Sequence, residues 1–347
     1  MTATCHLHAL SAYAPDTVLT NDDLANLVDT NDEWIVARTG IKQRRKLADT
    51  DNASDLGMVA ARRALEDAGI NAGYLTHIVA ATCTPDLLSP SVACILAGKL
   101  GAGPVMAFDF SAACSGFLYC LSICRAMLCQ APEARILFVC TEALTRRVNW
   151  SDRSTCVLFG DAATACVLTA SADKALAGVE DVICQSDGNQ RDLITVGGGT
   201  ACRYGLGQPT DENFFITMQG RETYKHAVRQ MVRICEQILA RNGLSIEDVD
   251  LFVPHQANMR IIEAVGSRLS IAEDRVFTNV ERYGNTSSAS IPLALAEARA
   301  AGRIAPGSRV LMTAFGAGLT WGAALLRFSG SAVDGLSAHC LRQARSV

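Results

Sequence analysis

Short apolar runs rich in β-branched residues alternate along the chain with longer segments whose apolar residues recur at helical spacing. The short runs predict strands at 77–81, 105–110, 136–140, 156–159, 163–169, 251–254, 310–314 and 322–328. The longer segments predict helices at 53–68, 90–100, 114–129, 221–242, 259–269 and 288–301. Because strands that alternate with helices are typical of parallel sheets covered by helices, the predicted fold class is α/β.

Two stretches about half a chain apart carry the same order of features. Residues 65–82 read LEDAGINAGYLTHIVAAT and residues 239–255 read LARNGLSIEDVDLFVPH, and each passes from a helix end through a glycine into a buried strand. Likewise RILFVC at 135–140 matches RVLMTA at 309–314. The segments around Cys114 and Asn285 fall at equivalent points between these landmarks. We therefore predict duplicated α/β halves, 1–175 and 176–328, followed by a tail, 329–347, with equivalent loops meeting at the junction of the halves.

Composition narrows the function classes. The 347 residues are 49% hydrophobic and 19% charged with a net charge of -4, which argues against nucleic acid as a partner. Residues 1–15 lack the basic lead and apolar run of a secretory signal. The longest uncharged run, 310–326, contains three glycines and is expected to form two buried strands joined by a turn rather than a membrane span. We expect a cytoplasmic protein that binds no membrane.

Fourteen cysteines require an explanation of their own. The chain is far longer than typical disulfide-stapled domains, so a disulfide framework is not expected. It contains no CxxC pair, and Cys120, Cys124 and Cys129 resemble one side of a helix with no histidine nearby, so no metal site is predicted. At least a dozen cysteines are expected to pack as small hydrophobic residues.

Cys114 differs from the others in its setting. It lies in Ser-Ala-Ala-Cys-Ser-Gly, between the strand that ends near Phe110 and a segment with helical spacing. At a helix N-terminus, free N–H groups and the helix dipole favour thiolate over thiol. One more buried cysteine in a cysteine-rich chain fits this motif equally well, so on the motif alone both interpretations stay open.

Three further loops carry candidate chemistry. His255, in Pro-His-Gln-Ala-Asn directly after an apolar strand, stands where a side chain can enter a site, and Asn258 could help to fix it. Asn285 lies in a small polar loop that an ordinary turn and N-cap would also explain, but its place opposite the cysteine loop in the repeat favours a functional role. Phe-Gly-Ala-Gly at 315–318 offers backbone N–H groups to an oxyanion, with the N–H of Cys114 as a second donor.

In this order and spacing the four motifs resemble those of thiolase-superfamily condensing enzymes, and most closely the β-ketoacyl-[acyl-carrier-protein] synthase III family. The resemblance extends from about Ala9 to Phe328 and includes NDEWI at 31–35, RTGI at 38–41 and FGD at 159–161. It implies a thiolase-like fold in which duplicated α/β halves form α-β-α-β-α layers. Elongating ketosynthases have a second histidine where Asn285 falls, and biosynthetic thiolases have a second cysteine in a Gly-His-Pro context; neither pattern is present.

The resemblance implies an acyltransferase with the triad Cys114, His255 and Asn285. The Cys114 thiolate would attack an acyl-CoA thioester while the backbone N–H groups of Cys114 and Ala317 hold the oxyanion. Malonyl-acyl-carrier protein would then lose CO2, with His255 and Asn285 stabilising the enolate. The carbanion would attack acyl-Cys114 and give a β-ketoacyl thioester, which starts fatty-acid synthesis. This chemistry requires no metal and no redox cofactor, since the CoA thioester is a substrate.

Binding roles follow from the same resemblance. Trp34 and Arg153 would sandwich the CoA adenine, and Arg260 and Arg268 would guide the acidic carrier protein. Further contacts along the CoA path would come from Thr30, Arg38, Gly220 and Asn258. A homodimer is expected, because the family is dimeric and two such halves leave sheet edges exposed.

Two positions depart from the family pattern. Ala317 stands where many members carry glycine; its N–H is retained, so we expect activity if the turn does not require a positive φ there. Ser89 stands where some members place a phenylalanine that closes the acyl pocket across the dimer. A serine leaves more room, so acyl primers other than acetyl become plausible, and the sequence does not define their length or branching.

Other functions are compatible with parts of this pattern. A specialised homologue could condense longer acyl groups, or use CoA-bound extenders, in secondary metabolism. A Cys–His–Asn thioesterase or cysteine protease would share the residue types, although the papain-type cysteine signature is absent. A scaffold without catalysis would not be acylated at Cys114. Labelling by acyl-CoA, release of free acid and formation of a condensation product distinguish these alternatives.

Overall fold

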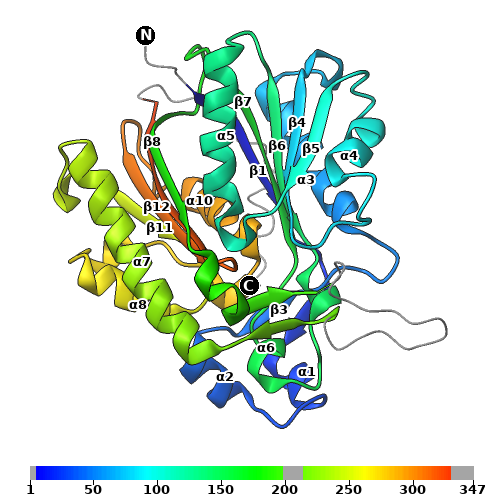
Figure 1. Ribbon diagram of the computed structural model, residues 1–347, viewed down its shortest axis with the longest axis vertical. Helices are drawn as coiled ribbons and strands as arrows, with labels where there is room; N and C mark the ends of the chain where they lie inside the picture. Colours follow the sequence, from blue (N-terminus) through cyan, green and yellow to red (C-terminus); the bar gives the residue numbers. More distant parts are fainter. Residues whose placement is uncertain (1–4, 198–213, 330–347) are drawn as a thin grey trace.

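The computed structural model describes residues 5–197 and 214–329. Nine strands form one large sheet in the order β11-β12-β13-β8-β1-β7-β6-β4-β5, with helices on its faces (Figure 1). The strands of this sheet are β1 (His6–Tyr13), β4 (His77–Ala81), β5 (Met106–Phe110), β6 (Ile136–Glu142), β7 (Ala162–Thr169), β8 (Ala177–Ser186), β11 (Leu251–Pro254), β12 (Arg309–Gly316) and β13 (Thr320–Phe328). Two small sheets pair β2 (Val18–Thr20) with β3 (Gln43–Arg45) and β9 (Ile194–Val196) with β10 (Ile216–Met218).

The helices are α1 (Asn21–Ala25), α2 (Asp32–Thr39), α3 (Ala53–Ala68), α4 (Val92–Leu100), α5 (Gly116–Gln130), α6 (Arg153–Cys156), α7 (Gly220–Arg241), α8 (Met259–Arg268), α9 (Val280–Tyr283) and α10 (Ser290–Ala300). The six predicted helices correspond to α3, α4, α5, α7, α8 and α10 and begin and end within two residues of the predicted positions, whereas the short helices α1, α2, α6 and α9 were not predicted. Local signals set several of these ends. Ser91 accepts a hydrogen bond from Cys94 N at the start of α4, and Gly69, at φ 63°, ends α3 in the left-handed conformation that glycine adopts at low cost.

Strand pairing confirms the predicted duplication. In the first half β4 pairs in parallel with β5 and β6, and β6 and β1 each pair antiparallel with β7. In the second half β11 pairs in parallel with β12, and β12 and β8 each pair antiparallel with β13. A single parallel bridge from Phe252 to Val276 stands where the second half would have its copy of β5.

Backbone landmarks recur at one separation along the chain. The helix-ending glycines, Gly69 and Gly243, have φ values of 63° and 64°. Ala113 and Ser287 have φ values of 47° and 49°, and each begins a 3₁₀ turn, η2 (Ala113–Ser115) or η8 (Ser287–Ala289), that leads into α5 or α10. The separation is identical in both pairs. The repeat-mate of Cys114 is therefore Ser288, and Asn285 precedes it by three residues.

Three hydrophobic cores fill the interfaces between five layers, and the central core fills two of them. One core packs α3 and α4 on the strands of the first half, and another packs α7 and α8 on the strands of the second half (Figure 1). The third contains residues of α5 and α10, such as Phe117 and Ile291, together with strand residues of both halves. This is the expected α-β-α-β-α order. Among the described residues, two residue pairs between β1 and β8, His6–Gly178 and Leu7–Ala177, join the two sets of strands into one sheet. The division at residue 175 into separate domains stays a prediction.

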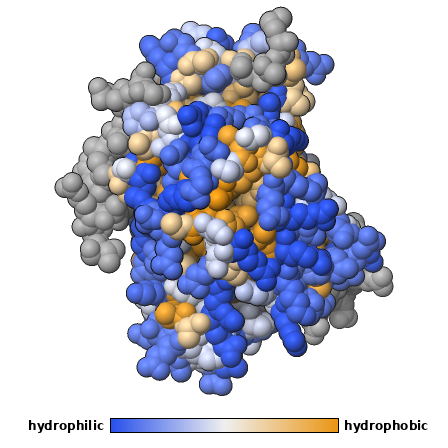
Figure 2. Space-filling view, turned by 90° about the vertical axis from the view of Figure 1, so that its left-hand side faces the viewer, coloured by the Kyte–Doolittle hydropathy of each residue, from blue (hydrophilic) through white to orange (hydrophobic). Residues whose placement is uncertain are grey.

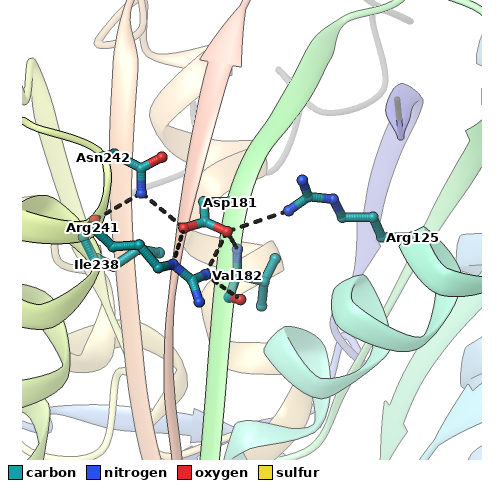
Figure 3. Close-up of polar contacts among 6 residues, drawn as sticks. All are labelled: Arg125, Asp181, Val182, Ile238, Arg241 and Asn242. Carbon is teal, nitrogen blue, oxygen red and sulfur yellow. Dashed lines mark hydrogen bonds and ion pairs between the residues drawn. The ribbon is translucent and has the colours of Figure 1, made fainter. Parts of the chain in front are cut away.

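A charged cluster connects the halves beside this junction. Asp181 on β8 accepts hydrogen bonds from Arg241 (2.5 and 2.7 Å) and Asn242 (2.8 Å) at the end of α7, and from Arg125 on α5 (3.3 Å) (Figure 3). Burial alone would raise the pKa of Asp181, but the hydrogen bonds from Arg241 and Asn242 outweigh it, so the pKa is lowered. The cluster thus fixes the central helix α5 relative to α7.

One predicted strand is wrong. Residues 156–159 form the end of α6 and a turn, and only Phe159 makes a bridge, to Asn285. The apolar run is buried in a fourth core under α1 and α2, which explains its composition. Its carbonyls bond to Arg44 and Asn285 instead of to a neighbouring strand.

The uncharged run 310–326 forms β12, a tight turn and β13, as expected. By length and composition alone, Ala113–Gln130 is the one described helical segment that could cross a membrane, and 44% of it is buried in the protein. A core helix meets the same criterion, and α5 lies in the central core. On the face shown in Figure 2, apolar residues gather near the middle and hydrophilic residues surround them.

Candidate active site

Cys114, His255 and Asn285 line one cavity of about 760 Å³. They come from three loops of both halves, η2 before α5, the segment after β11 and the loop before η8. The repeat brings these loops together at the junction of the halves, as the sequence indicated. The wall also contains apolar side chains, among them Phe159, Met218, Met231 and Phe315. The cavity can therefore hold an elongated ligand that is partly apolar.

Cys114 lies in a tight turn at the N-terminal side of α5. Ala113, the residue before it, has a φ of 47°, a conformation that costs energy in any residue with a side chain. Burial raises the pKa of Cys114 to about 12, and hydrogen bonding from Ser287 opposes this increase. Because a helix N-terminus contributes at most about 2 kcal/mol, or roughly 1.5 pKa units, the free thiol is protonated at neutral pH. Burial of Cys114 thus opposes the helix end, which by itself favours the thiolate.

The glycine turn approaches the backbone of Cys114 closely. A Cβ atom on Gly316 would lie 2.7 Å from Cys114 N and 3.1 Å from Cys114 Cβ, so only glycine fits at the end of β12. Ala317 is not among the residues with a positive φ, so its methyl group is compatible with the turn. The backbone N–H groups of Cys114 and Ala317 thus belong to adjoining turns, which is what an oxyanion hole requires.

His255 is buried, and its Nδ1 lies against the hydroxyl of Ser290. The distance from His255 Nδ1 to Ser290 Oγ is 2.5 Å, and Gln256 N donates to the same hydroxyl oxygen at 3.4 Å. The hydroxyl proton is then free to donate to Nδ1, which favours the tautomer with its proton on Nε2. Burial lowers the pKa of His255 to about 3, so the ring is neutral at physiological pH. The suggestion that Asn258 fixes this histidine is wrong.

Asn285 is held by its backbone and by its side-chain oxygen. Asn285 N donates to Leu158 O at 2.8 Å, and Gly160 N donates to Asn285 O at 3.0 Å. Asn285 Oδ1 accepts from Ser287 N at 2.9 Å. The side-chain oxygen is thereby occupied, and the Nδ2 amide is left as a donor in the cavity wall. His255 and Asn285 together offer two neutral hydrogen-bond donors.

Sequence reasoning missed the polar residues behind the triad. Glu142, at the end of β6, is fully buried, and it accepts hydrogen bonds from Ser288 Oγ at 2.7 Å and from Cys83 N at 3.0 Å. Burial raises the pKa of Glu142, and the donors around it oppose this increase. Ser287 and Ser290 lie in the loop YGNTSSAS, but its composition did not distinguish them from N-cap residues. The repeat offered the available signal, because Ser288 is equivalent to Cys114.

Most of the predicted CoA-binding residues lie at the same cavity. Trp34, Arg38, Arg153, Gly220 and Asn258 all line it. The guanidinium groups of Arg38 and Arg153 lie 4.6 and 4.7 Å from the centre of the Trp34 ring. Asn258 caps α8 through Arg260 N and donates to Arg38 O at 3.1 Å, so it joins α8 to α2.

Three other predicted residues, Thr30, Arg268 and Ser89, do not line this cavity. Thr30 lies outside it, with a buried Oγ1 that has no hydrogen-bond partner among the described residues. Arg260 lines the cavity, whereas Arg268 lines a separate hollow of about 360 Å³ beside α7, together with Lys225 and Arg229. Ser89 is exposed on the loop before α4 and does not line the cavity in the single chain. The described residues contain no group of three or more His, Cys, Asp or Glu side chains that could hold a metal ion.

Two family models match the chain. The model of 3-oxoacyl-[acyl-carrier-protein (ACP)] synthase III matches residues 108–188, and the model of the C-terminal part of the same family matches residues 239–328. The first match contains Cys114 and the second contains His255 and Asn285. The two matches therefore cover all three triad positions.

Relatives and solved structures agree with these matches. The chain is 57% identical to the β-ketoacyl-[acyl-carrier-protein] synthase III of Nitratidesulfovibrio vulgaris (strain DSM 19637 / Miyazaki F), over 93% of this chain and 98% of that protein. The crystal structure of 3-oxoacyl-[acyl-carrier-protein] synthase III from Aquifex aeolicus VF5 is similar with a TM-score of 0.85 and 42% identity, over 93% of this chain and 100% of that one. A priming β-ketosynthase from the R1128 polyketide biosynthetic pathway is similar with a TM-score of 0.83 and 32% identity, over 94% and 96%. The chain belongs to the β-ketoacyl-[acyl-carrier-protein] synthase III family of acyltransferases.

Proposed function

We propose that the chain condenses an acyl-CoA primer with malonyl-acyl-carrier protein by a decarboxylative Claisen reaction, which initiates fatty-acid synthesis. The observation that carries this proposal is the convergence of Cys114, His255 and Asn285 from both halves of the fold on one cavity. Family membership supports the same reaction.

In the first half-reaction Cys114 attacks the thioester carbonyl of acyl-CoA. The tetrahedral oxyanion is held by the N–H groups of Cys114 and Ala317, and its collapse breaks the bond to the CoA sulfur. Because the free thiol is protonated, its proton leaves during this step and finally resides on the released CoA thiol. The result is acyl-Cys114 and free CoA.

In the second half-reaction malonyl-carrier protein occupies the cavity and loses CO2. The electron pair of the broken C–C bond forms a thioester enolate, whose oxygen accepts hydrogen bonds from His255 Nε2 and Asn285 Nδ2. The carbanion carbon then attacks acyl-Cys114, the Cys114 thiolate leaves, and a proton taken up from solvent restores the thiol. Both donors are uncharged, so they form no ion pair with the enolate that would have to be broken when the product leaves.

CoA and the carrier protein bind through different sets of residues. Trp34, Arg38, Arg153, Gly220 and Asn258 bind CoA along the cavity, with Thr30 at its margin. The carrier protein, which is acidic, docks near Arg260 and Arg268, and the lysine and arginine beside Arg268 in the second hollow support this assignment.

We also propose a homodimer in the cytoplasm. The side chains of Leu87, Leu88 and Met106 are 54%, 82% and 58% exposed, and Met106 begins β5, an edge strand of the sheet. Exposed apolar side chains beside a free strand edge favour association with a second copy. Ser89 directly follows Leu88 in the chain, so its effect on primer size depends on the partner. Analytical ultracentrifugation tests the assembly.

The experiment supplies purified protein with radiolabelled acyl-CoA and malonyl-carrier protein. We expect labelled protein, CO2 and β-ketoacyl-carrier protein; absence of both CO2 and condensation product refutes the proposal. Cys114→Ala should abolish labelling, and Cys94→Ala, a change of an exposed cysteine on α4, should not. His255→Ala and Asn285→Ala should slow decarboxylation more than acylation. Release of free acid without condensation would instead indicate a thioesterase.

A second candidate keeps this chemistry and changes the primer. The similarity to a priming ketosynthase of a polyketide pathway favours it, as does the small side chain of Ser89. A series of acyl-CoA primers of increasing length and branching, compared by kcat/KM, distinguishes the two candidates.

A further inference from the structure

The backbone of Asn285 is held by one segment of the other half of the molecule. Leu158 O accepts from Asn285 N at 2.8 Å, and Asn285 O accepts from Gly160 N at 3.0 Å. Asn285 thus pairs with residues 158–160 as a single bridge between strands, centred on Phe159. Any shift of this segment moves the Asn285 side chain with it.

Arg44 holds this segment from behind. It lies on β3 and its side chain is 0% exposed. One terminal nitrogen donates to Val157 O at 2.7 Å, and the other donates to Asn21 Oδ1 at 2.8 Å and to Leu19 O at 3.3 Å. Among the residues that the structure describes, no carboxylate forms an ion pair with Arg44. The guanidinium therefore connects the β2–α1 region to segment 157–160, which pairs with the backbone of Asn285.

The stem of Arg44 packs against two glycines of the same assembly. A Cβ on Gly160 would lie 2.3 Å from Tyr283 O and 3.0 Å from Arg44 Cβ. A Cβ on Gly284 would lie 2.6 Å from Leu158 O and 3.4 Å from Arg44 Cβ. The two chain segments and the stem of Arg44 are thus in close contact, which leaves little freedom for Asn285 to move.

A buried cation without a counter-ion is costly, and neutral acceptors offset only part of the desolvation penalty. Burial lowers the pKa of Arg44 to about 10, so it stays charged at neutral pH. Replacing Arg44 with an apolar residue removes this desolvation penalty together with the hydrogen bonds. The free energy of unfolding therefore falls by less than the hydrogen bonds alone contribute. The effect of Arg44 on the position of Asn285 can therefore be measured separately from its effect on stability.

We propose that Arg44 is a positioning residue for Asn285, acting through Val157 O and the segment 157–160. This inference rests on the proposed function, in which Asn285 Nδ2 donates to the enolate oxygen during decarboxylation. Arg44 contacts neither substrate nor reacting atoms in this arrangement. The acylation of Cys114 depends on the turn at 316–317, which Arg44 does not contact, so the two half-reactions should respond differently.

The test replaces Arg44 with methionine, which keeps most of the stem and removes both terminal nitrogens. We expect CO2 release from malonyl-carrier protein to slow about 10- to 100-fold, because displacements below 1 Å have effects of this size on positioned groups. Labelling of Cys114 by radiolabelled acyl-CoA in a single turnover should stay within about threefold of the wild-type rate. Arg44→Lys retains one donor and should recover part of the loss.

Arg63→Met is the matched control. Arg63 lies on α3, donates to Ala12 O at 3.0 Å and stacks over the ring of Tyr13, so its contacts are to a backbone carbonyl and a ring away from segment 157–160. It should leave both half-reactions within about threefold of wild type. If Arg44→Met does not fold, the Arg44→Lys protein is compared with this control by the same two measurements.

Asn285→Ala and the double variant complete the test. If Arg44 acts through Asn285, Arg44→Met should cause no further loss of CO2 release in the Asn285→Ala background. Absence of CO2 and condensation product from the unaltered protein would overturn the proposed function itself, and normal decarboxylation by Asn285→Ala would overturn the role assigned to Asn285, on which this inference depends. Slow decarboxylation by Asn285→Ala with normal decarboxylation by Arg44→Met would overturn only this inference, and so would equal slowing of both half-reactions by the Arg44 variants.

Discussion

Gly316→Ala is the substitution for which the structure yields the sharpest expectation. The added Cβ would lie 2.7 Å from Cys114 N, 3.1 Å from Cys114 Cβ and 3.2 Å from Ala113 Cβ. Ordinary contacts begin at 3.4 Å, so the backbones of Cys114 and residue 316 must separate by about 0.7 Å. The atom displaced most directly is the Cys114 N–H, one of the two donors assigned to the oxyanion.

Loss of one oxyanion donor costs about 10²- to 10³-fold in rate, so acylation should slow about 100-fold in Gly316→Ala. The assay is single-turnover labelling of Cys114 by radiolabelled acyl-CoA. Overpacking also lowers the free energy of unfolding by about 1–3 kcal/mol, so thermal unfolding is followed in parallel and labelling is measured well below the transition.

Gly98→Ala is the matched control, because no atom lies within 4 Å of a Cβ built on this glycine in α4. It should acylate at the wild-type rate and be more stable by up to about 1 kcal/mol, since alanine is the better helix former. Acylation by folded Gly316→Ala within about threefold of wild type would refute the assignment of the oxyanion to this turn.

Three more expectations follow from charge and burial. Alkylation of Cys114 by iodoacetamide should rise about tenfold per pH unit from pH 6 to 9, because a pKa of about 12 leaves thiolate scarce throughout this range; a plateau near pH 7 would contradict it. Arg153→Ala should raise KM for acyl-CoA about tenfold with little change in kcat, measured by steady-state kinetics. Asp181→Asn should lower the free energy of unfolding by about 1–3 kcal/mol at pH 7, as measured by urea titration. The lowered pKa of Asp181 means that this contribution is present above its ordinary pKa of 3.8 and is lost as the pH falls through the folded-state value, so the difference between wild type and variant should shrink as the pH is lowered below 3.8.

The sequence predicted a helix or strand accurately where its ends depend only on residues nearby in the chain. The helix at 53–68 and the strands at 77–81 and 251–254 agree with the structure at both ends, because apolar periodicity and helix-ending glycine are encoded within a few residues. The strand predicted at 156–159 failed for the opposite reason. Its apolar residues are buried in the core under α1 and α2, and its hydrogen bonds go to a loop more than a hundred residues away.

By itself the sequence determined the α/β class, the duplication and the identity of the three side chains that meet in the cavity. Motif order and the internal repeat carry that information, since equivalent loops of duplicated halves must face the same junction. Only the tertiary structure decided the chemical state of these side chains. The protonated Cys114 thiol, the neutral His255 ring with its Ser290 partner and the fixed backbone of Asn285 all depend on burial and on hydrogen bonds from distant segments. Such contacts are absent from any local pattern, because they exist only when the chain is packed.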